Sequence, residues 1–371
     1  MAFTEKYVTV AGAGAHDGTS EANAWTFAEM IAATPAAESR VNIKAGSYSA
    51  GATTLPALGT ALQPIILRGY NSTIGDLDGQ GRSSTDQTLT TTNMPDITIT
   101  GLWTPSPFCF LQNLDITGAL SSALIGSTAA DNWGAVNCRI VTTQNNAAAR
   151  CVQTDNDCFF VNVDFGGTGA AHASLLDGDE QTVIIGCRFS PTSGNICVEI
   201  NSGIVQDCVF SGGATHVKFL ALALGRIEMV WGCTMYGAST AAIQFPNAAP
   251  ANNPPIIGNN HVTDCAKYID GLYTATDDTP VIEMWNRTRD NTTPRTGILS
   301  VVLGGEVTTD GGDNTTDYTN AAGGDFELID TAPGYATGMI PFGDIGAIQH
   351  QDPAGGGGGG LLTHPGMSGR V

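Results

Sequence analysis

Positive charge is scarce in this sequence. Charged residues make up 13% of the chain, and Lys plus Arg number 15 against 35 for Asp plus Glu, so the formal net charge is -20. Such an acidic chain is repelled by nucleic acid and by anionic membrane surfaces, and we expect neither as a partner. The excess acid either keeps a large protein soluble or forms a surface that faces cations or carbohydrate.

Long apolar runs are missing as well. The sequence contains no stretch of ~20 apolar residues that could span a bilayer. Residues 1–6 do not begin a segment of the signal-peptide kind. The composition is rich in Gly, Ala, Thr, Asn and Asp and poor in the Glu, Lys and Leu of long surface helices. We therefore expect a chain made in a reducing cytoplasm, with no membrane anchor and little helix.

Paired cysteines are also absent. The nine cysteines are odd in number and include no CxxC spacing, whereas disulfide frameworks and zinc sites need paired or clustered Cys. Most of them lie in apolar, strand-like segments. We expect free, buried thiols and no cofactor.

A short pattern is repeated seven times between Leu111 and Val262. Each copy has Asn, Gly or Asp, then usually Cys, Leu or Val, then a variable residue, then a large apolar residue, and the copies begin 21 to 27 residues apart. This period, with strand-type residues at the repeated positions, is typical of a solenoid with stacked turns. The copies are Asn113–Ile116, Asn137–Ile140, Asn162–Phe165, Gly186–Phe189, Asp207–Phe210, Gly232–Met235 and Asn259–Val262.

The first residue of each copy predicts a bend. Another mostly apolar residue lies two positions earlier, so the alternation of inward and outward side chains shifts by one at the start residue. Asn, Gly and Asp tolerate the left-handed conformation that such a bend needs. Each copy therefore predicts strand, one-residue corner, strand. The thiols of Cys138, Cys187, Cys208 and Cys233 share one position and should stack as an inward ladder.

The first 70 residues predict a cap. Segment 24–33 is the best helix in the sequence, with Trp25, Ala28 and residues 30–32 on its apolar face. The first turn of a solenoid would otherwise expose its interior and a row of unpaired backbone groups. The helix is expected to close that end.

These segments resemble a known family. The Asp-Gly-Thr loop at 17–19, the Trp-containing helix, the Val-x-Ile-x-x-Gly-x-Tyr strand at 41–48 and the Pro-Ile-x-Leu-Arg-Gly-Tyr strand at 64–70 look like the entry of pectin-lyase-like right-handed parallel β-helix proteins. The Asp-Ile-Gly-Ala segment at 344–347 resembles their closing strand. The resemblance covers residues 5 to 350 and implies an all-β, single-stranded right-handed parallel β-helix.

Three parts of the chain are predicted. Residues 1–75 form the cap and first turns, 76–350 the β-helix, and 351–371 a Gly-rich tether with a terminal docking peptide. Arg287 and Arg289 fall in inward positions, which predicts that the regular core ends near Asn286. After the six glycines come Leu361, Leu362 and Met367, which either belong to a disordered end or dock on a neighbouring chain in a homo-oligomer.

Candidate chemistry is confined to acids at one corner. They come from two successive turns and are expected to lie within one or two ~4.8 Å inter-strand steps of each other. They could be solvated turn residues, a structural Ca²⁺ site or a catalytic acid pair. The candidates are Asp155, Asp157, Asp177, Asp179 and Glu180.

Known catalytic motifs of the family are missing. The polygalacturonase-like set is absent apart from an isolated Asp277-Asp278, and so is the pectate-lyase-like Arg-x-Pro-x-x-Arg. Trp103, Trp133 and Tyr236 would either stack on sugar rings or pack in the core.

Three functions are consistent with this sequence. The first is a non-enzymatic structural protein of a virus particle, of the bacteriophage type, located in the virion as a head decoration or a tail or fibre component, with other virion proteins or copies of itself as partners. The second is a polysaccharide lyase or glycoside hydrolase of the spike type. The third is a non-catalytic module that binds bacterial surface polysaccharide. We expect the first, on the missing catalytic set and the terminal tether.

Overall fold

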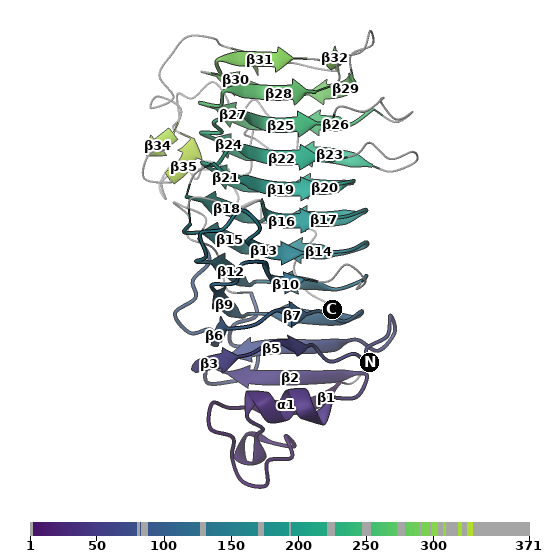
Figure 1. The fold of residues 1–371 in the computed structure, drawn as a ribbon, viewed down its shortest axis with the longest axis vertical. Coiled ribbons are helices and arrows are strands. Elements are labelled where there is room, and N and C mark those ends of the chain that lie inside the picture. Colours follow the sequence, from purple (N-terminus) through teal and green to yellow (C-terminus); the bar gives the residue numbers. More distant parts are fainter. Residues whose placement is uncertain are drawn as a thin grey trace, which may run out of the picture.

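The chain winds as a right-handed parallel β-helix (Figure 1). The computed structural model describes residues 3–79, 82, 88–126, 131–169, 174–192, 194–220, 227–246, 254–272, 279–289, 291–296, 298–302, 307–308, 318–320 and 325–328. In each regular turn the chain passes through three parallel sheets, which we call A, B and C, and each strand pairs with the same strand of the next turn. The predicted fold is confirmed.

Sheet A is the longest of the three and has 12 strands among the described residues. They are β1 Thr4–Val8, β2 Ser39–Lys44, β5 Ile65–Tyr70, β8 Cys109–Gln112, β11 Gly134–Val136, β14 Phe159–Val161, β17 Thr182–Ile185, β20 Gly203–Gln206, β23 Glu228–Trp231, β26 Ile256–Gly258, β29 Thr279–Met284 and β32 Ile298–Val302.

Sheet B follows the corner, and 11 of its strands lie in the part of the chain that the structure describes. They are β3 Ser47–Ala50, β6 Asp96–Ile99, β9 Asp115–Gly118, β12 Arg139–Thr142, β15 Asp164–Gly167, β18 Arg188–Pro191, β21 Val209–Ser211, β24 Thr234–Tyr236, β27 His261–Thr263, β30 Arg287–Arg289 and β33 Val307–Thr308.

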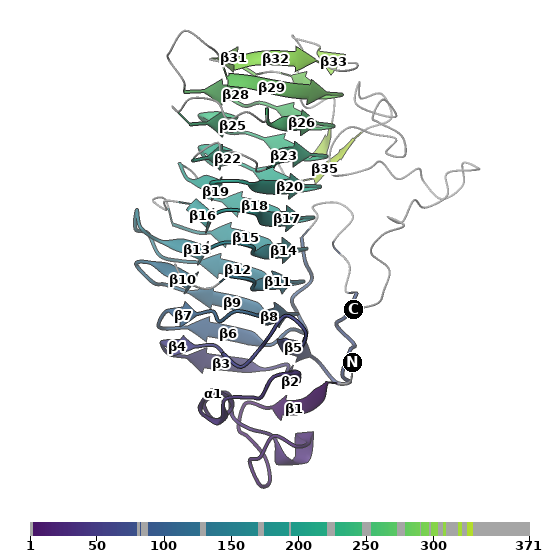
Figure 2. The same cartoon turned by 90° about the vertical axis from the view of Figure 1, so that its right-hand side faces the viewer.

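Sheet C completes each turn and has 10 described strands. They are β4 Thr53–Thr54, β7 Trp103–Thr104, β10 Ala123–Gly126, β13 Arg150–Gln153, β16 Ser174–Gly178, β19 Ile196–Ile200, β22 Thr215–Phe219, β25 Ala241–Phe245, β28 Lys267–Gly271 and β31 Thr293–Thr296. Figure 2 shows sheets C and A side by side along the solenoid.

The predicted corners are all present. The first residue of every copy has a positive φ, between 52° for Asn137 and 64° for Gly232, which is the left-handed region that Asn, Asp and Gly tolerate. Trp285, with φ 48°, continues this series in the next turn. The repeat there starts at Trp285 and not at Asn286, so Arg287 takes the variable, outward position of its turn.

The prediction that the core ends near Asn286 was therefore wrong. Trp is not a residue expected at a left-handed corner, and reading the repeat one residue late moved Arg287 inward. The three sheets continue through β31, β32 and β33. Arg287 is nevertheless fully buried.

The interior consists of stacks that run along the solenoid. Phe189 lies between Phe165 and Phe210, with ring centroids 4.9 and 5.0 Å apart and nearly parallel planes. All nine cysteines are free and buried, which confirms the predicted thiol ladder. Burial raises the pKa of Cys138 to about 12, so its thiol stays protonated and unreactive.

A helix closes the N-terminal end, as predicted, but over a shorter range. Helix α1 spans Phe27–Ala33, after the 3₁₀ helix η1 at Glu21–Asn23. Thr26 and Glu29 form a capping box at its start. Phe27 stacks on Trp103 at 5.4 Å.

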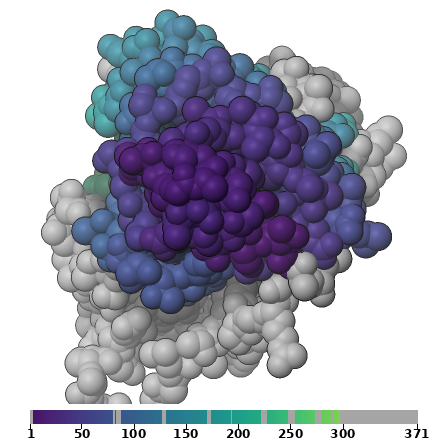
Figure 3. Space-filling view, turned by 90° about the horizontal axis from the view of Figure 1, so that it is seen from below, coloured from purple at the N-terminus to yellow at the C-terminus, as the bar shows by residue number. Residues whose placement is uncertain are grey.

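Trp25 lies before α1 instead of inside it. It pairs with Val8 as a β-bridge, and of the expected apolar face Met30 is buried while Ala28 and Ala32 are exposed. In Figure 3 the N-terminal residues cover this end of the molecule.

Only part of the predicted C-terminal region falls on residues that the structure describes. β34 (Tyr318–Asn320) and β35 (Asp325–Leu328) form a separate antiparallel pair. The Asp-Ile-Gly-Ala segment, the glycine run and Leu361, Leu362 and Met367 lie outside the described residues. The three domain boundaries stay predictions.

Candidate functional site

A row of aspartates follows sheet C where the chain turns toward sheet A. Asp155 and Asp179 occupy one position on two successive turns, and Asp131 of the preceding turn lies one place later, aligned with Asn156 and Glu180. Asn156 links Asp131 to Asp155, because its backbone N–H and side-chain amide both donate to the Oδ1 atoms of these two aspartates. Asp179 accepts a hydrogen bond from the Nδ2 of Asn201, on the following turn.

Three of the predicted acids line one pocket at this corner. The pocket has a volume of about 160 Å³, and Asp155, Asp177 and Asp179 all contribute to it. Its other walls are neutral: Gln153, Thr154, Gly178, Asn201 and Leu220. The expectation that these acids of neighbouring turns converge is confirmed for these three.

Asp177 differs from the other two because it lies on the sheet face with a cation beside it. Its Oδ2 is 2.9 Å from Nε of Arg150, and it accepts a 3.4 Å hydrogen bond from Gln153. Burial raises the pKa of Asp177, Arg150 opposes this, and Glu199 and Asp179 add to the rise.

Asp155 lies in the middle of the row. Loss of hydration raises the pKa of its carboxyl, and the negative charges of Asp131 and Asp179 raise it further against the lowering effect of the Asn156 N–H. None of the described ion pairs involves these three row aspartates. Asp155 therefore combines a raised pKa with the absence of a cation among the described ion pairs, whereas Asp177 has Arg150 beside it.

The remaining two candidates do not join the pocket. Asp157 is exposed and takes a left-handed conformation with φ 56°, and its backbone N–H donates to the carbonyl oxygen of Glu180. The side chains of Asp157 and Glu180 do not line the pocket. Asp131, which aligns with Asn156 of the next turn, was missed in the sequence.

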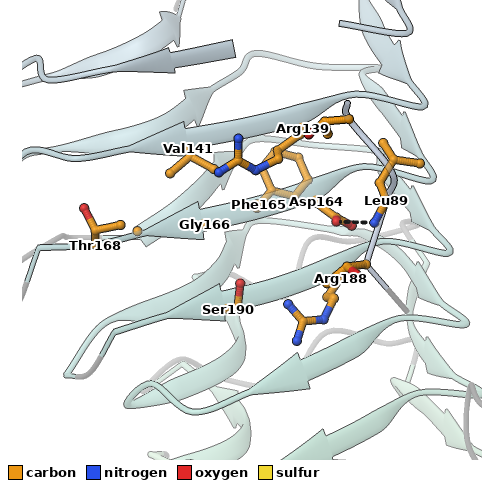
Figure 4. A pocket seen from close by; sticks show the side chains of 12 residues that line it. Leu89, Arg139, Val141, Asp164, Phe165, Gly166, Thr168, Arg188 and Ser190 are labelled. Atoms are coloured by element: carbon orange, nitrogen blue, oxygen red, sulfur yellow. Dashed lines mark hydrogen bonds between the residues drawn. The ribbon is translucent and has the colours of Figure 1, made fainter. Parts of the chain in front are cut away.

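A second hollow lies on the outer face of sheet B (Figure 4). Its volume is about 240 Å³, and it lies over Gly166, whose missing side chain leaves space between Val141 and Ser190 of the adjacent strands. Arg139, Asp164 and Arg188 of three successive turns form one side, and Leu89 approaches from the loop between β5 and β6.

Charged contacts in this hollow hold the loop on the sheet. Asp164 pairs with Arg82 and accepts the backbone N–H of Leu89 at 2.7 Å, and Nη1 of Arg139 lies 2.9 Å from Asp115. The sequence signal was present but unused. The variable position of four successive copies reads Asp115, Arg139, Asp164, Arg188, a ladder of alternating charge.

The aromatic candidates and the calcium alternative gain little support from the structure. Trp103 and Trp133 are fully buried, so the suggestion that they stack on sugars was wrong, while Tyr236 is partly exposed. Among the described residues, no group of three or more His, Cys, Asp or Glu side chains is arranged to hold a metal ion, which leaves the calcium alternative without support. The described helices include none that is long and apolar enough to cross a membrane.

Comparisons with known proteins find similarity in solved structures alone. No family model and no curated protein matches the chain. Pectate lyase Pel9A is 11% identical over 95% of this chain and 97% of its own, with a TM-score of 0.49. A rhamnogalacturonan lyase is 15% identical over 77% and 74%, and the GH136 lacto-N-biosidase from Eubacterium ramulus 11% over 82% and 67%, both with a TM-score of 0.40. Each is a protein that this chain is similar to in fold only.

Proposed function

We propose that the chain binds a neutral polysaccharide at the corner between sheets C and A and hydrolyses it. The observation that carries this proposal is the convergence of Asp155, Asp177 and Asp179 on one pocket. Hydrolysis of a glycosidic bond needs one carboxyl group that gives a proton and a second that acts as base or nucleophile. Adjacent turns are ~4.8 Å apart, so Asp155 and Asp179 can face the same bond.

The two carboxyl groups would have different roles. Asp155 is the proton donor, because loss of hydration and the neighbouring carboxylates raise its pKa. Asp179 is the base or nucleophile, oriented by the amide of Asn201. The rate should fall as the pH rises above the raised pKa of Asp155, since the donor is then deprotonated.

The lining of the pocket favours a neutral sugar and hydrolysis over elimination. Gln153, Thr154 and Asn201 can hydrogen-bond sugar hydroxyls, and Leu220 offers an apolar wall to the face of a ring. The basic residue nearest to these acids, Arg150, is paired with Asp177. An acidic sugar would meet three carboxyl groups and no cation in the lining.

The assembly role in a virus particle stays a prediction, because its candidate residues Leu361, Leu362 and Met367 lie outside the described chain. The bacteriophage origin, the virion location and the absence of a cofactor are likewise untested expectations.

The test compares matched Asp→Asn variants on a panel of neutral and acidic bacterial polysaccharides. Asp155→Asn and Asp179→Asn should each lower the release of new reducing ends by about 10²- to 10⁴-fold. Asp157→Asn is the control, since it makes the same change at the same corner outside the pocket, and Asn tolerates its left-handed backbone. Equal release by wild type and Asp179→Asn, or no release by wild type from any polysaccharide, would contradict the proposal. Binding that is lost in the variants without any release would favour the non-catalytic glycan-binding alternative.

A further inference from the structure

The outer face of sheet A is apolar over most of the solenoid. From β8 to β29 each strand directs two side chains outward, at one and three positions before the corner. All are partly exposed apolar side chains except two Gln and two Gly. The apolar stripe, as we call this set, consists of Phe110, Val136, Phe159, Val161, Val183, Ile185, Ile204, Met229, Trp231, Ile256, Ile282 and Met284.

The two glycines make the stripe smooth. Gly134 lies between Phe110 and Phe159 in the register, and the two rings meet above it at 5.2 Å. Gly258 lies under Trp231, and a Cβ at Gly258 would be 2.1 Å from the indole ring. Both sites let a large ring lie flat along the sheet.

The other two faces of the same turns are charged. On sheet B the outward position after the corner reads Asp115, Arg139, Asp164, Arg188 in the first four turns, followed by Val209, Thr234, His261 and Arg287. On sheet C the outward position reads Gln153, Asp177, Glu199, Lys218, Gln244, Asp270. The outward positions of sheet A from β8 to β29 carry no charged side chain, so this face differs from both of its neighbours.

The apolar surface also extends around the corner from sheet C. Leu220 and Leu272 follow β22 and β28 and are 39% and 38% exposed, and Ile227, just before β23, is 61% exposed. Seven inter-strand steps of ~4.8 Å give the stripe a length of roughly 34 Å. A contiguous apolar surface of this kind more often marks an interaction site than a surface that stays in contact with solvent.

We infer that the apolar stripe is the contact surface for a second copy of this chain. The net charge of -20 makes two copies repel each other wherever their acidic faces meet. The apolar stripe is the face on which two such copies can approach without burying like charges. A partner of opposite charge would instead select sheet B or C.

The regular register of sheet A also fits a second copy. Because neighbouring strands are parallel and in step, the apolar stripe is straight and repeats at a fixed interval. Two identical stripes placed side by side are self-complementary over their whole length, as a symmetric interface requires. A stable contact buries ~800 Å² per partner, so the corner residues Ile227 and Leu272 are expected to take part. Leu220 also lines the proposed sugar pocket, so the contact is assigned to the apolar stripe with Ile227 and Leu272, and in that form the inference is independent of the proposed hydrolysis.

The test is sedimentation of the purified full-length chain over a range of concentrations, beside a Val183→Lys/Met229→Lys double variant. Both substitutions place a cation in the apolar stripe, and they lower the net negative charge, so any loss of association does not come from a greater overall charge on the chain. Long charged side chains are already accommodated at outward strand positions, as Glu199 and Lys218 show on sheet C. The matched control is Leu62→Lys, at a leucine that is 75% exposed in a loop. Circular dichroism and thermal melting check that each variant is folded.

Wild type and Leu62→Lys should sediment as a dimer or larger species, and the double variant should require at least a tenfold higher concentration to associate. Three results would overturn the inference: a wild-type monomer at ~100 μM, equal association of wild type and folded double variant, or association that is lost on removal of residues 354–371 and unaffected by the double variant. The last result would assign the contact to the terminal peptide.

Discussion

The middle turns and the last turns of the solenoid satisfy the same backbone groups with different side chains. In the middle, the residue after the corner is usually Cys, and the Cys187 thiol lies 3.4 Å from both the N–H of Val163 and the carbonyl oxygen of Phe160 in the preceding turn. In the last turns the same position is Asn. Asn260 accepts the N–H of Cys233 at 2.9 Å and donates to Val230 O at 3.0 Å.

A second position changes in the same direction. Two residues before the corner, the middle turns carry apolar side chains, whereas the turn of β29 carries Glu283, which is almost fully buried. Nε and Nη2 of Arg295 bind its two carboxylate oxygens at 2.9 Å each. The interior thus changes from apolar stacking to hydrogen bonds and an ion pair along the chain.

The apolar middle turns are the more rigid part of the solenoid. The proposed site lies on turns whose interior is built from Phe160, Phe165 and Phe189, and close packing fixes the backbone that holds the acids. In a solenoid each turn is stabilised mainly by its neighbours. The effect of a substitution in one region should therefore be independent of the other region.

The largest effect is expected in the middle turns. Phe189→Ala removes the central ring of a three-ring stack and should lower the free energy of unfolding by about 3 to 5 kcal/mol, because a cavity remains. Urea titration followed by circular dichroism measures it. A loss below about 1 kcal/mol would mean that the ring is not packed as described.

In the last turns, Arg295→Met should lower the free energy of unfolding by about 3 kcal/mol, because it removes the bidentate partner of a buried carboxylate. The control is the double variant Glu283→Leu/Arg295→Met, which replaces the whole pair by apolar groups and should recover most of the loss. If the double variant is as unstable as the single one, the pair does not account for the stability of this turn.

Asn260→Val should cost about 1 to 3 kcal/mol in urea titration, because it leaves the N–H of Cys233 and the carbonyl oxygen of Val230 without this amide. Asn260→Cys is the matched control and should be less harmful, since a thiol fills this position in the middle turns. Equal losses for Val and Cys would show that the contact is one of volume alone.

The smallest change is expected for Cys233→Asn, which extends the amide ladder by one turn. The amide can reach the Val205 carbonyl that the thiol now contacts at 3.6 Å, so the free energy of unfolding should change by less than about 1 kcal/mol. A loss above about 2 kcal/mol, measured in the same titration, would show that the two regions are not interchangeable.

Much of the fold could be predicted because residue type and spacing in the repeat indicate where the strands and corners lie. The corners from Asn113 to Asn259, the thiol ladder and the inward position of Phe189 follow from residue type and period. Trp285 could not be predicted as a corner, since its left-handed backbone is imposed by the turns stacked around it. That single residue misplaced Arg287.

The site was predicted in part. Asp155, Asp177 and Asp179 were found because acids on neighbouring turns are visible in sequence, whereas Asp131 aligns with Asn156 and not with another acid of the next turn. The outer faces were not predicted. A residue such as Ile204 gives the same signal whether its strand faces solvent or a partner, and only the register shows that it continues an apolar stripe.

The most direct measurement for the central claim is the structure of the Asp179→Asn variant with an oligosaccharide from whichever polysaccharide the chain binds. We predict a sugar ring in the corner pocket, with its glycosidic oxygen within hydrogen-bonding distance of the Asp155 carboxyl group and a ring face against Leu220. A sugar bound in the hollow over Gly166 on sheet B, or elsewhere with the corner pocket empty, would contradict the proposed function.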